Sequence, residues 1–497
     1  MKTSFKDLIV YEIYPTSFYD SNGDGTGDLP GIAAKLEYIQ DLGFNALWIN
    51  PFYVSPFRDG GYDVADFFNV DPRFGTLEDF RGLIAQAHAR GMKVFLDLVA
   101  GHASVDNREF RRSAEAQRNE CSDLFIWNSS VWDLEPGYRL ISGMYPRHGC
   151  YLVNFFAHQP AFNYGFNKVE YPWQMPYKDE RTQQARNYIL DVMRFWLAQG
   201  ADGFRVDMAD SLVKNDEGKQ ATIAVWQDLF SVIRKEYPDV FFVSEWSDPA
   251  QALKAGFDAD FVLDHWDNFY HRLVRSTENT RGVSVFNGGG DMAYTLRDMQ
   301  YRFREAEKYG ACLSLISGNH DSPRIADFLT EDRLRMFYLA LMSLPGIPFV
   351  LYGDELGMKT ADLPSKDGGY QRTGTRIPMI WDDTEPHHGF SQTDGQTYLP
   401  YCDINRVSVQ SACGDESSLY HFIRKLIRLR QDTEALRDPH TNITEEDRVL
   451  RFTRGEELEL VLNLSDKTVP VQGKVITASR EISDVLLPYT GALVKKQ

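Results

Sequence analysis

The segment Gly203-Phe-Arg-Val-Asp207 places an arginine and a carboxylate two residues apart within an apolar stretch. Side chains alternate between the two faces of a β-strand, so Arg205 and Asp207 share one face, opposite Phe204 and Val206. Because a neighbouring cation lowers the pKa of a carboxylate, we expect Asp207 to be ionised at neutral pH. An ionised, oriented carboxylate suits a nucleophile. A purely structural ion pair is the competing interpretation.

Three further segments carry polar side chains directly after an apolar run. They are Asp97-Leu-Val-Ala-Gly-His102, Ser244-Glu245-Trp246 and Gly318-Asn-His-Asp321. Each alone is a weak signal, since a lone histidine after a strand is usually an ordinary loop residue. Together they add the carboxyl groups of Glu245 and Asp321 to Asp207, and carboxyl groups serve as nucleophiles and as general acids. Four such clusters are hard to explain by structure alone.

These segments belong to a series of apolar, strand-like runs that alternates with helical patterns. The strand candidates are residues 8–14, 46–50, 94–99, 203–206, 241–244, 261–263, 313–317 and 348–352. Between them, Ile189, Val192 and Trp196 recur at helical spacing, and Thr76 with Asp79 resembles a capping box. About eight strand-then-helix units in series predict a parallel (β/α)8 TIM barrel, in which catalytic groups lie at the carboxyl ends of the strands.

Two parts of the chain depart from this alternation. Residues 103–177 show no clear helical pattern but many Trp, Tyr, Asn and Pro residues, so we expect an insertion domain after the third strand. After about residue 437 the pattern changes to the two-residue alternation of an antiparallel sheet. The predicted domains are a catalytic barrel over 1–102 and 178–437, the insertion domain over 103–177, and a C-terminal β-sandwich domain over 438–497.

Composition narrows the class of protein. The chain has 497 residues, 43% of them hydrophobic, which is ample for a large core. Its net charge of −18, without any Lys/Arg cluster, argues against a nucleic-acid partner. We expect no membrane partner, because no apolar window is long enough to span a bilayer and the N-terminus lacks a signal-peptide pattern. Five scattered cysteines indicate neither a disulfide framework nor a zinc site, so we expect a cytoplasmic protein.

The polar segments resemble the α-amylase family of glycoside hydrolases. Residues 203–207 are similar to its nucleophile strand, Glu245-Trp246 to its acid/base segment, residues 319–321 to its third-carboxylate segment, and residues 97–102 to its third-strand segment. The resemblance extends from Tyr11 to about residue 437. Within the family, three segments look most like those of oligo-1,6-glucosidases, α-glucosidases and neopullulanase-like enzymes: Tyr11-Glu-Ile-Tyr-Pro15, Gln159-Pro-Ala-Phe-Asn163 and Arg376-Ile-Pro-Met-Ile-Trp381.

The resemblance implies a role for each of these residues. Asp207 would be the nucleophile, Glu245 the acid/base, and Asp321 the carboxylate that supports the oxocarbenium-like transition state. Trp246 is expected to desolvate Glu245 and so to raise its pKa. The implied substrate-binding residues are Arg205, Tyr62, His102, His320, Asp59 and Arg376. Among these, Asp59 and Arg376 would meet across the cleaved subsite and bind the 4-hydroxyl of the terminal sugar.

The loop after the first strand is a candidate metal site. Asp20, Asn22, Asp24 and Asp28 offer alternating oxygen ligands, and Thr26 could add its carbonyl. We expect Ca²⁺, with Mg²⁺ as the alternative ion; a metal-free loop of Asx turns is the competing interpretation. A different calcium site of many α-amylases uses an Asn before the third-strand histidine. Here that residue is Gly101, so we expect that site to be absent.

The sequence therefore predicts a retaining glycoside hydrolase that cleaves α-glucosidic bonds of short α-glucans, or of malto- and isomalto-oligosaccharides, in an exo-acting way. A transglycosylase or sugar isomerase acting on sucrose or maltose is the alternative, because water and sugar compete for the same glycosyl-enzyme intermediate. A non-catalytic binding protein is a third hypothesis, against which the three carboxylates argue. Met208, Ala161 and Phe162 depart from the family patterns, which leaves the preference between α-1,4 and α-1,6 linkages open.

Overall fold

The computed structural model describes residues 5–263, 267–275, 283–368, 372–401 and 407–496. Eight parallel strands close into a barrel in the order β1-β12-β11-β10-β9-β8-β5-β2. They are β1 (Val10–Ile13), β2 (Ala46–Ile49), β5 (Lys93–Leu98), β8 (Gly203–Val206), β9 (Phe241–Ser244), β10 (Ala259–Val262), β11 (Cys312–Ile316) and β12 (Ile347–Leu351). Each overlaps one of the eight apolar runs, so the predicted (β/α)8 barrel is confirmed.

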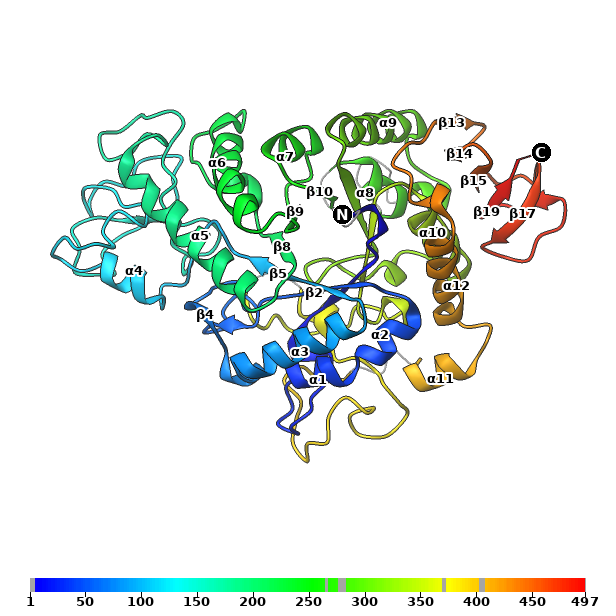
Figure 1. Cartoon of the computed structure of the whole chain (residues 1–497), viewed down its shortest axis with the longest axis horizontal. Coiled ribbons are helices and arrows are strands. Elements are labelled where there is room, and N and C mark those ends of the chain that lie inside the picture. The colour runs from blue at the N-terminus through cyan, green and yellow to red at the C-terminus, as the bar shows by residue number, and fades with distance from the viewer. Residues whose placement is uncertain (1–4, 264–266, 276–282, 369–371, 402–406, 497) are drawn as a thin grey trace.

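Helices surround this barrel (Figure 1). They are α1 (Leu29–Ala34), α2 (Leu36–Leu42), α3 (Leu77–Ala89), α5 (Gln183–Ala198), α6 (Gln220–Glu236), α7 (Pro249–Ala255), α8 (Phe269–Val274), α9 (Met292–Tyr309), α10 (Glu331–Ser343), α11 (Val409–Gly414) and α12 (Leu419–Asp432). The capping box is present at the start of α3, where Asp79 N–H donates to Thr76 Oγ1 (3.2 Å) and Thr76 N–H donates to Asp79 Oδ2 (2.8 Å). The apolar stripe of α5 is buried against the barrel at Ile189, Val192 and Trp196.

The segment between β5 and α5 forms the flank at the left of Figure 1. It contains one short helix, α4 (Arg108–Ser113), and one small hairpin, β6 (Leu140–Ile141) with β7 (Tyr151–Leu152). We did not expect the helix, because six residues are too few to show an apolar stripe. It is stabilised by an Asn107 cap and by Phe110, whose ring contacts those of Trp127 and Tyr151. A second short ladder, β3 (Tyr53–Val54) with β4 (Asp66–Val70), lies after β2.

The C-terminal part of the chain forms an antiparallel sheet at the other end of the molecule (Figure 1), as the alternating pattern predicts. Its strands, in spatial order, are β13 (Ile443–Glu446), β14 (Val449–Arg454), β15 (Leu458–Asn463), β19 (Thr490–Lys495) and β17 (Lys474–Ala478). A two-stranded sheet, β16 (Val469–Pro470) with β18 (Val485–Leu486), shares a small apolar core with it. The sheet also packs on α10, where Gly491 lies close to Leu339. The predicted domain boundaries stay predictions.

Candidate active site

The two catalytic candidates Asp207 and Glu245 directly follow neighbouring strands, β8 and β9. Their backbones still belong to the parallel ladder: Asp207 N–H donates to the Leu98 carbonyl (3.1 Å) and Glu245 N–H to the Val206 carbonyl (3.0 Å). Both side chains therefore start from rigid backbone. Met208, which has a left-handed φ of 42°, turns the chain so that its own N–H donates to Glu245 Oε2 (2.9 Å).

One buried guanidinium connects three carboxylates below the pocket. Arg205 is 1% exposed, and its Nη1 lies 2.6 Å from Asp97 Oδ1 and 3.0 Å from Asp207 Oδ1. Its Nη2 lies 2.7 Å from Glu245 Oε1. Trp48 donates its indole N–H to Asp97 Oδ2 (2.8 Å), which holds the far end of this network. Sequence reasoning identified Arg205 and Asp207 but missed Asp97 as the second anchor.

The pKa of Asp207 differs from the expectation. Burial and the nearby Glu245 carboxylate raise the pKa of Asp207, and Arg205 opposes them without cancelling them. Arg205 lowers the pKa of Asp207 as expected, but the net shift is upward because this one cation also serves Asp97 and Glu245, which the sequence did not reveal.

Asp321, in the loop after β11, lies between two guanidinium groups. Its Oδ1 is 2.8 Å from Arg372 Nη1 and 2.6 Å from Arg376 Nη2, and its Oδ2 is 3.4 Å from His320 Nε2. Burial opposes ionisation, but His320, Arg372 and Arg376 outweigh it and lower the pKa of Asp321. Asp321 is therefore an anion at neutral pH. A fixed anion at the pocket wall stabilises positive charge that develops beside it.

Asp59 pairs with Arg372 instead of Arg376, so the predicted pairing is wrong. Arg372 Nη2 lies 2.6 Å from Asp59 Oδ1, and Gln159 of the insertion donates to Asp59 Oδ2 (2.6 Å). Arg376 is only 2% exposed and lies under Gly60, where an added Cβ would be 2.3 Å from its Nη1. The two arginines stand four residues apart in one loop, so the sequence pointed to the correct segment but to the wrong residue.

The aromatic candidates surround the same place. The Tyr62 ring stacks on the His320 imidazole with centroids 5.1 Å apart, and the Tyr62 hydroxyl donates to Asp97 Oδ2 (3.2 Å). His102 is 1% exposed; its Nε2 donates to the Tyr62 carbonyl (3.2 Å) and its Nδ1 accepts from Asn154 Nδ2 (3.3 Å). Burial lowers the pKa of His102 to about 3, so this imidazole is neutral.

A pocket of about 480 Å³ at the carboxyl ends of the strands is lined by Asp207, Glu245, Asp321, Asp59, Tyr62 and His102, whereas Arg205, His320 and Arg376 lie behind this lining. Six described carboxyl groups and two guanidinium groups line it: Asp59, Asp207, Asp210, Glu245, Asp267 and Asp321, with Arg302 and Arg372. Sequence reasoning did not single out Asp210, Asp267 or Arg372, which lie in short segments between the main elements, or Arg302, which lies on α9. The described lining is strongly acidic, and it also contains the apolar surfaces of Phe155, Met208, Trp246 and Leu263.

Lys214 links the insertion to the loop that follows the nucleophile candidate. Its Nζ donates to Asn154 Oδ1 (2.6 Å) and to the Ser211 carbonyl. A Cβ at Gly101 would lie 2.6 Å from Asn154 Nδ2, so glycine is the residue that leaves room for this amide. The Lys214 amino group and the Asn154 amide thus join barrel and insertion beside Gly101, where many α-amylases have a calcium-binding Asn.

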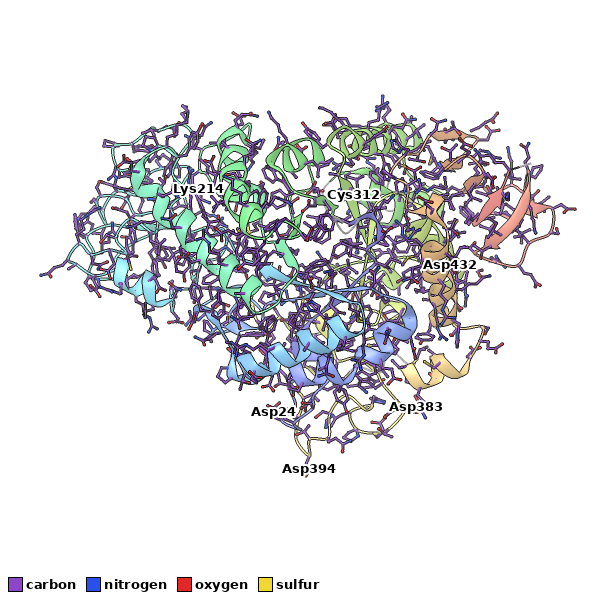
Figure 2. All side chains as sticks on the ribbon, viewed as in Figure 1. Asp24, Lys214, Cys312, Asp383, Asp394 and Asp432 are labelled. Carbon is purple, nitrogen blue, oxygen red and sulfur yellow. The ribbon has the colours of Figure 1, made fainter. Side chains whose placement is uncertain are left out.

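The candidate calcium loop folds its polar side chains onto its own backbone. Asp20 Oδ1, Asn22 Oδ1 and Asp24 Oδ1 each accept the N–H two residues further on, at 3.1, 2.9 and 2.8 Å, which is Asx-turn geometry. Asp28 caps α1 through Gly31 N–H (2.6 Å). Within the described residues, no cluster of three or more His, Cys, Asp or Glu side chains is arranged to hold a metal. Calcium here stays a prediction. Figure 2 shows Asp24 at the lower edge of the molecule, well away from Lys214.

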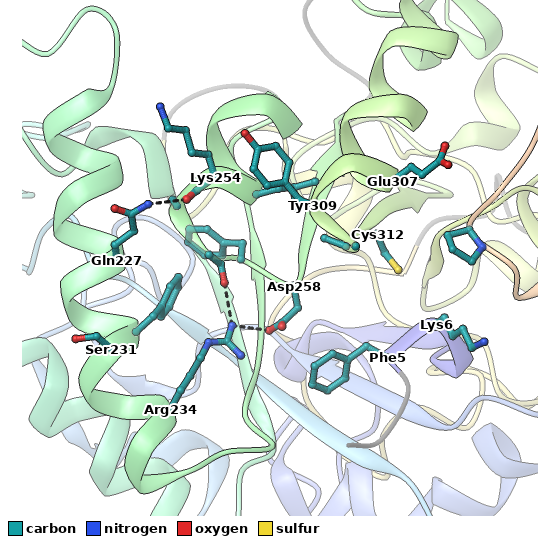
Figure 3. A pocket seen from close by; sticks show the side chains of 18 of the residues that line it. Phe5, Lys6, Gln227, Ser231, Arg234, Lys254, Asp258, Glu307, Tyr309 and Cys312 are labelled. Carbon is teal, nitrogen blue, oxygen red and sulfur yellow. Dashed lines mark hydrogen bonds and ion pairs between the residues drawn. The ribbon is translucent and has the colours of Figure 1, made fainter. Parts of the chain in front are cut away.

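A larger pocket, of about 1000 Å³, lies at the opposite end of the barrel, where β10 and β11 begin (Figure 3). Its Arg234 is already bonded to Asp258 Oδ2 (2.8 Å) and to the Gly256 carbonyl (3.0 Å). Burial raises the pKa of the Cys312 thiol to about 11, so this thiol is a poor nucleophile. Because barrels of this class react at the carboxyl ends of their strands, we assign the chemistry to the smaller pocket.

A (β/α)8 barrel with two carboxyl groups at neighbouring strand ends, and a third, ionised carboxylate beside them, defines a glycosidase. Residues 12–439 match the model of the α-amylase family, described as the alpha-amylase catalytic domain. The chain belongs to the α-amylase family.

Two relatives are similar over nearly the whole chain. An oligo-1,6-glucosidase of Parageobacillus thermoglucosidasius is 28% identical over 93% of this chain and 91% of its own length. A probable alpha-glucosidase of Rhizobium meliloti is 30% identical over 98% of this chain and 96% of its own. Among solved structures, the trehalulose synthase MutB of Pseudomonas mesoacidophila MX-45 superposes with a TM-score of 0.82 at 23% identity, covering 99% of each chain. This last likeness shows the shared fold alone.

No helix within the described residues combines the length and the apolar character needed to cross a bilayer.

Proposed function

We propose that the protein is an exo-acting α-glucosidase that releases glucose from the non-reducing end of short, uncharged α-glucans. The observation that carries this proposal is the set of carboxyl groups of Asp207, Glu245 and Asp321 around one pocket, with the Asp59–Arg372 ion pair in its wall. The names of the two relatives, oligo-1,6-glucosidase and probable alpha-glucosidase, support the same substrate class.

The reaction would proceed in two displacements at the anomeric carbon. In the first, the Asp207 carboxylate attacks this carbon while Glu245 gives its proton to the glycosidic oxygen, and the aglycone leaves. In the second, Glu245 takes a proton from water, which displaces Asp207 and restores both groups. Asp321, whose pKa is lowered by its neighbours, would stabilise the oxocarbenium-like charge in both steps.

The Asp59–Arg372 pair supports an exo mode of action. Arg372 holds Asp59 and Asp321 at once, and Gln159 from the insertion fixes the other Asp59 oxygen. A planar guanidinium flanked by carboxylates matches the hydroxyl groups of a terminal sugar. The guanidinium donates hydrogen bonds to these hydroxyl groups, and the carboxylates accept hydrogen bonds from them. In this arrangement the ion pair would close the pocket beyond the sugar that is cleaved.

The charge of the pocket supports an uncharged substrate. Among the described lining residues, six carboxyl groups face two guanidinium groups, and both of these are engaged: Arg372 by Asp59 and Asp321, and Arg302 by Asp298 and the Ser247 carbonyl. A phosphate on the sugar would meet this surplus of negative charge, so we expect phosphorylated disaccharides to be poor substrates.

A product assay tests the proposal. The protein is incubated separately with maltose, isomaltose, sucrose and starch, and the products are resolved by chromatography. Free glucose from the short sugars, with almost no fall in starch viscosity, is the expected result. New disaccharides would instead indicate a transglycosylase or isomerase, and a rapid fall in starch viscosity with little glucose would indicate an endo-acting enzyme. The absence of turnover on any sugar would contradict the proposal.

We also propose that the loop of Asp20, Asn22, Asp24, Thr26 and Asp28 binds calcium. The oxygens that accept backbone N–H groups keep lone pairs for a cation, and Asn22 and Asp24 are exposed. An ion bound only by the folded state raises the melting temperature as its concentration increases. Equal melting temperatures in chelator and in millimolar calcium would refute this proposal; a rise with magnesium instead would identify the alternative ion.

For location we propose the cytoplasm. The four described cysteines, Cys121, Cys150, Cys312 and Cys413, form no disulfide, which fits a reducing compartment; Cys402 lies outside the described residues. Fractionation of the source cells, followed by an activity assay of each fraction, tests this location.

A further inference from the structure

A fully buried carboxyl group, Glu12 of β1, lies beneath the pocket and has no part in the reaction described above. It is 0% exposed, and its Oε1 lies 2.8 Å from His320 Nδ1 and 3.2 Å from Asn50 Nδ2. Its Oε2 has no hydrogen-bond partner within the described structure. Burying a carboxylate anion with one unpaired oxygen costs free energy. The contact with His320 therefore raises the question of whether Glu12 is ionised or protonated.

His320 is held in a fixed orientation by its neighbours. Its imidazole lies parallel to the ring of Tyr62 (5.1 Å between centroids, 6° between planes) and to that of Tyr14 (6.1 Å, 9°). In this orientation the ring nitrogen Nδ1 points at Glu12. The other ring nitrogen, Nε2, lies 3.4 Å from Asp321 Oδ2. Nε2 also has no hydrogen-bond partner within the described residues. His320 is 0% exposed, and its Nε2 lies directly behind Asp321, which lines the pocket.

Two arrangements of the protons are available to a neutral imidazole. If Glu12 were ionised, it would accept a hydrogen from Nδ1; Nε2 would then be a bare acceptor facing the Asp321 carboxylate, and two lone pairs would oppose each other. If Glu12 is protonated, its O–H donates to Nδ1, the ring hydrogen is on Nε2, and this N–H points toward Asp321. In the second arrangement Nδ1 is a bare acceptor, which also suits the Asn50 amide donor Nδ2 at 3.1 Å, and Nε2–H faces the Asp321 carboxylate 3.4 Å away.

The surroundings favour the second arrangement. Burial raises the pKa of Glu12, and Asp97 adds to this effect, while Asn50, Arg205 and His320 oppose it without cancelling it. Burial also lowers the pKa of His320 despite the neighbouring Asp321, and Arg376, Arg205 and Arg372 lower it further.

We propose that Glu12 is a positioning residue that donates a hydrogen bond from its neutral carboxyl group to Nδ1 of His320, and thereby keeps a hydrogen on Nε2 for a sugar hydroxyl. The inference rests on the proposed function for the identity of the ligand as a sugar, but the tautomer itself is a property of the free protein. Glu12 does not touch the substrate; it acts through His320. The Nε2–H and the Asp321 carboxylate then form a donor–acceptor pair for neighbouring hydroxyl groups of the bound sugar.

Two variants separate a donor from an anion at this position. In Glu12→Gln, an amide of nearly the same shape donates to Nδ1 and cannot ionise, so we expect kcat/KM to stay within about threefold of the parent value. Glu12→Met fills the same space without a donor. It should lower kcat/KM by about 10- to 100-fold, on whichever glycoside the parent protein cleaves. Glu355→Gln is the matched control: Glu355 is equally buried but binds Tyr11 and Tyr38, and this variant should keep full activity.

A loss in Glu12→Gln as large as that in Glu12→Met would show that an anion is required, and full activity of Glu12→Met would show that the contact has no role. Either result overturns the proposal. If the variants fail to fold, ¹⁵N NMR of the unaltered protein labelled in its 11 histidines decides the question. The His320 signal, identified by its loss in His320→Gln, should report a bare Nδ1 and a protonated Nε2. The opposite tautomer refutes the proposal even if no sugar substrate is found.

Discussion

Removing Arg372 should weaken the recognition of the terminal sugar, because this guanidinium holds Asp59 and Asp321 at once. The guanidinium lies 2.6 Å from Asp59 and 2.8 Å from Asp321, and the Arg372 and Asp59 side chains are 13% and 6% exposed, so water screens the contact poorly. A hydrogen bond between charged groups contributes about 1.5–3 kcal/mol. Because each 1.36 kcal/mol is a factor of ten, Arg372→Ala and Asp59→Ala should each lower kcat/KM on maltose or isomaltose by roughly 10- to 150-fold.

The double variant tests whether the two residues act as one unit. If they do, Asp59→Ala combined with Arg372→Ala should lose little more than either alone, which corresponds to a coupling free energy of about 1.5–3 kcal/mol. Arg302 is the control, since it lines the same pocket but contacts Asp298 and the Ser247 carbonyl. The loss of transition-state stabilisation in Arg302→Ala should add to the loss in Asp59→Ala within about 0.5 kcal/mol. Additive losses for Asp59 and Arg372, or near-normal activity of Arg372→Ala, would refute the reasoning.

Three more changes have defined outcomes. Asp207→Asn should lower turnover by at least about 10³-fold while circular dichroism stays unchanged, and trapping of a fluorinated glycosyl intermediate on another residue would contradict its role as nucleophile. Glu245→Gln should slow disaccharides far more than activated aryl glucosides, which need little protonation; equal losses would count against an acid role. Burial raises the pKa of Glu355 to about 7 from 4.5, so the folded state keeps a proton that the unfolded state loses in this interval. The free energy of unfolding should therefore fall as pH rises through it. Glu355→Gln should remove up to about 1.4 kcal/mol per pH unit of that slope, as measured by urea titration.

The barrel could be predicted because its information is local. Each strand is a short apolar run, and the alternation of Arg205 and Asp207 with Phe204 and Val206 is visible within four residues. The capping box at Thr76 is equally local. Features of this kind depend on neighbours in the sequence, so spacing alone reveals them.

The pairings across the site could not be predicted in the same way. Asp59 and Arg372 are 313 positions apart, and Arg205 and Asp97 are 108 apart, so only the closed fold brings each pair together. The resemblance to relatives directed attention to Arg376, but the backbone places Arg376 under Gly60 and leaves Arg372 to reach Asp59. Likewise, the pKa of Asp207 depends on how many carboxylates share Arg205, which no spacing discloses.

The acidic lining of the pocket has a practical consequence for the bench. A small organic ammonium ion that also carries hydroxyl groups can satisfy the unbalanced carboxylates and occupy the sugar hydroxyl positions at the same time. The common buffer tris(hydroxymethyl)aminomethane has this composition, and below its own pKa it is a cation. Activity measured in that buffer should therefore be too low, by an amount that shrinks as substrate is added. Phosphate or another anionic buffer is the appropriate medium for comparing the variants described above.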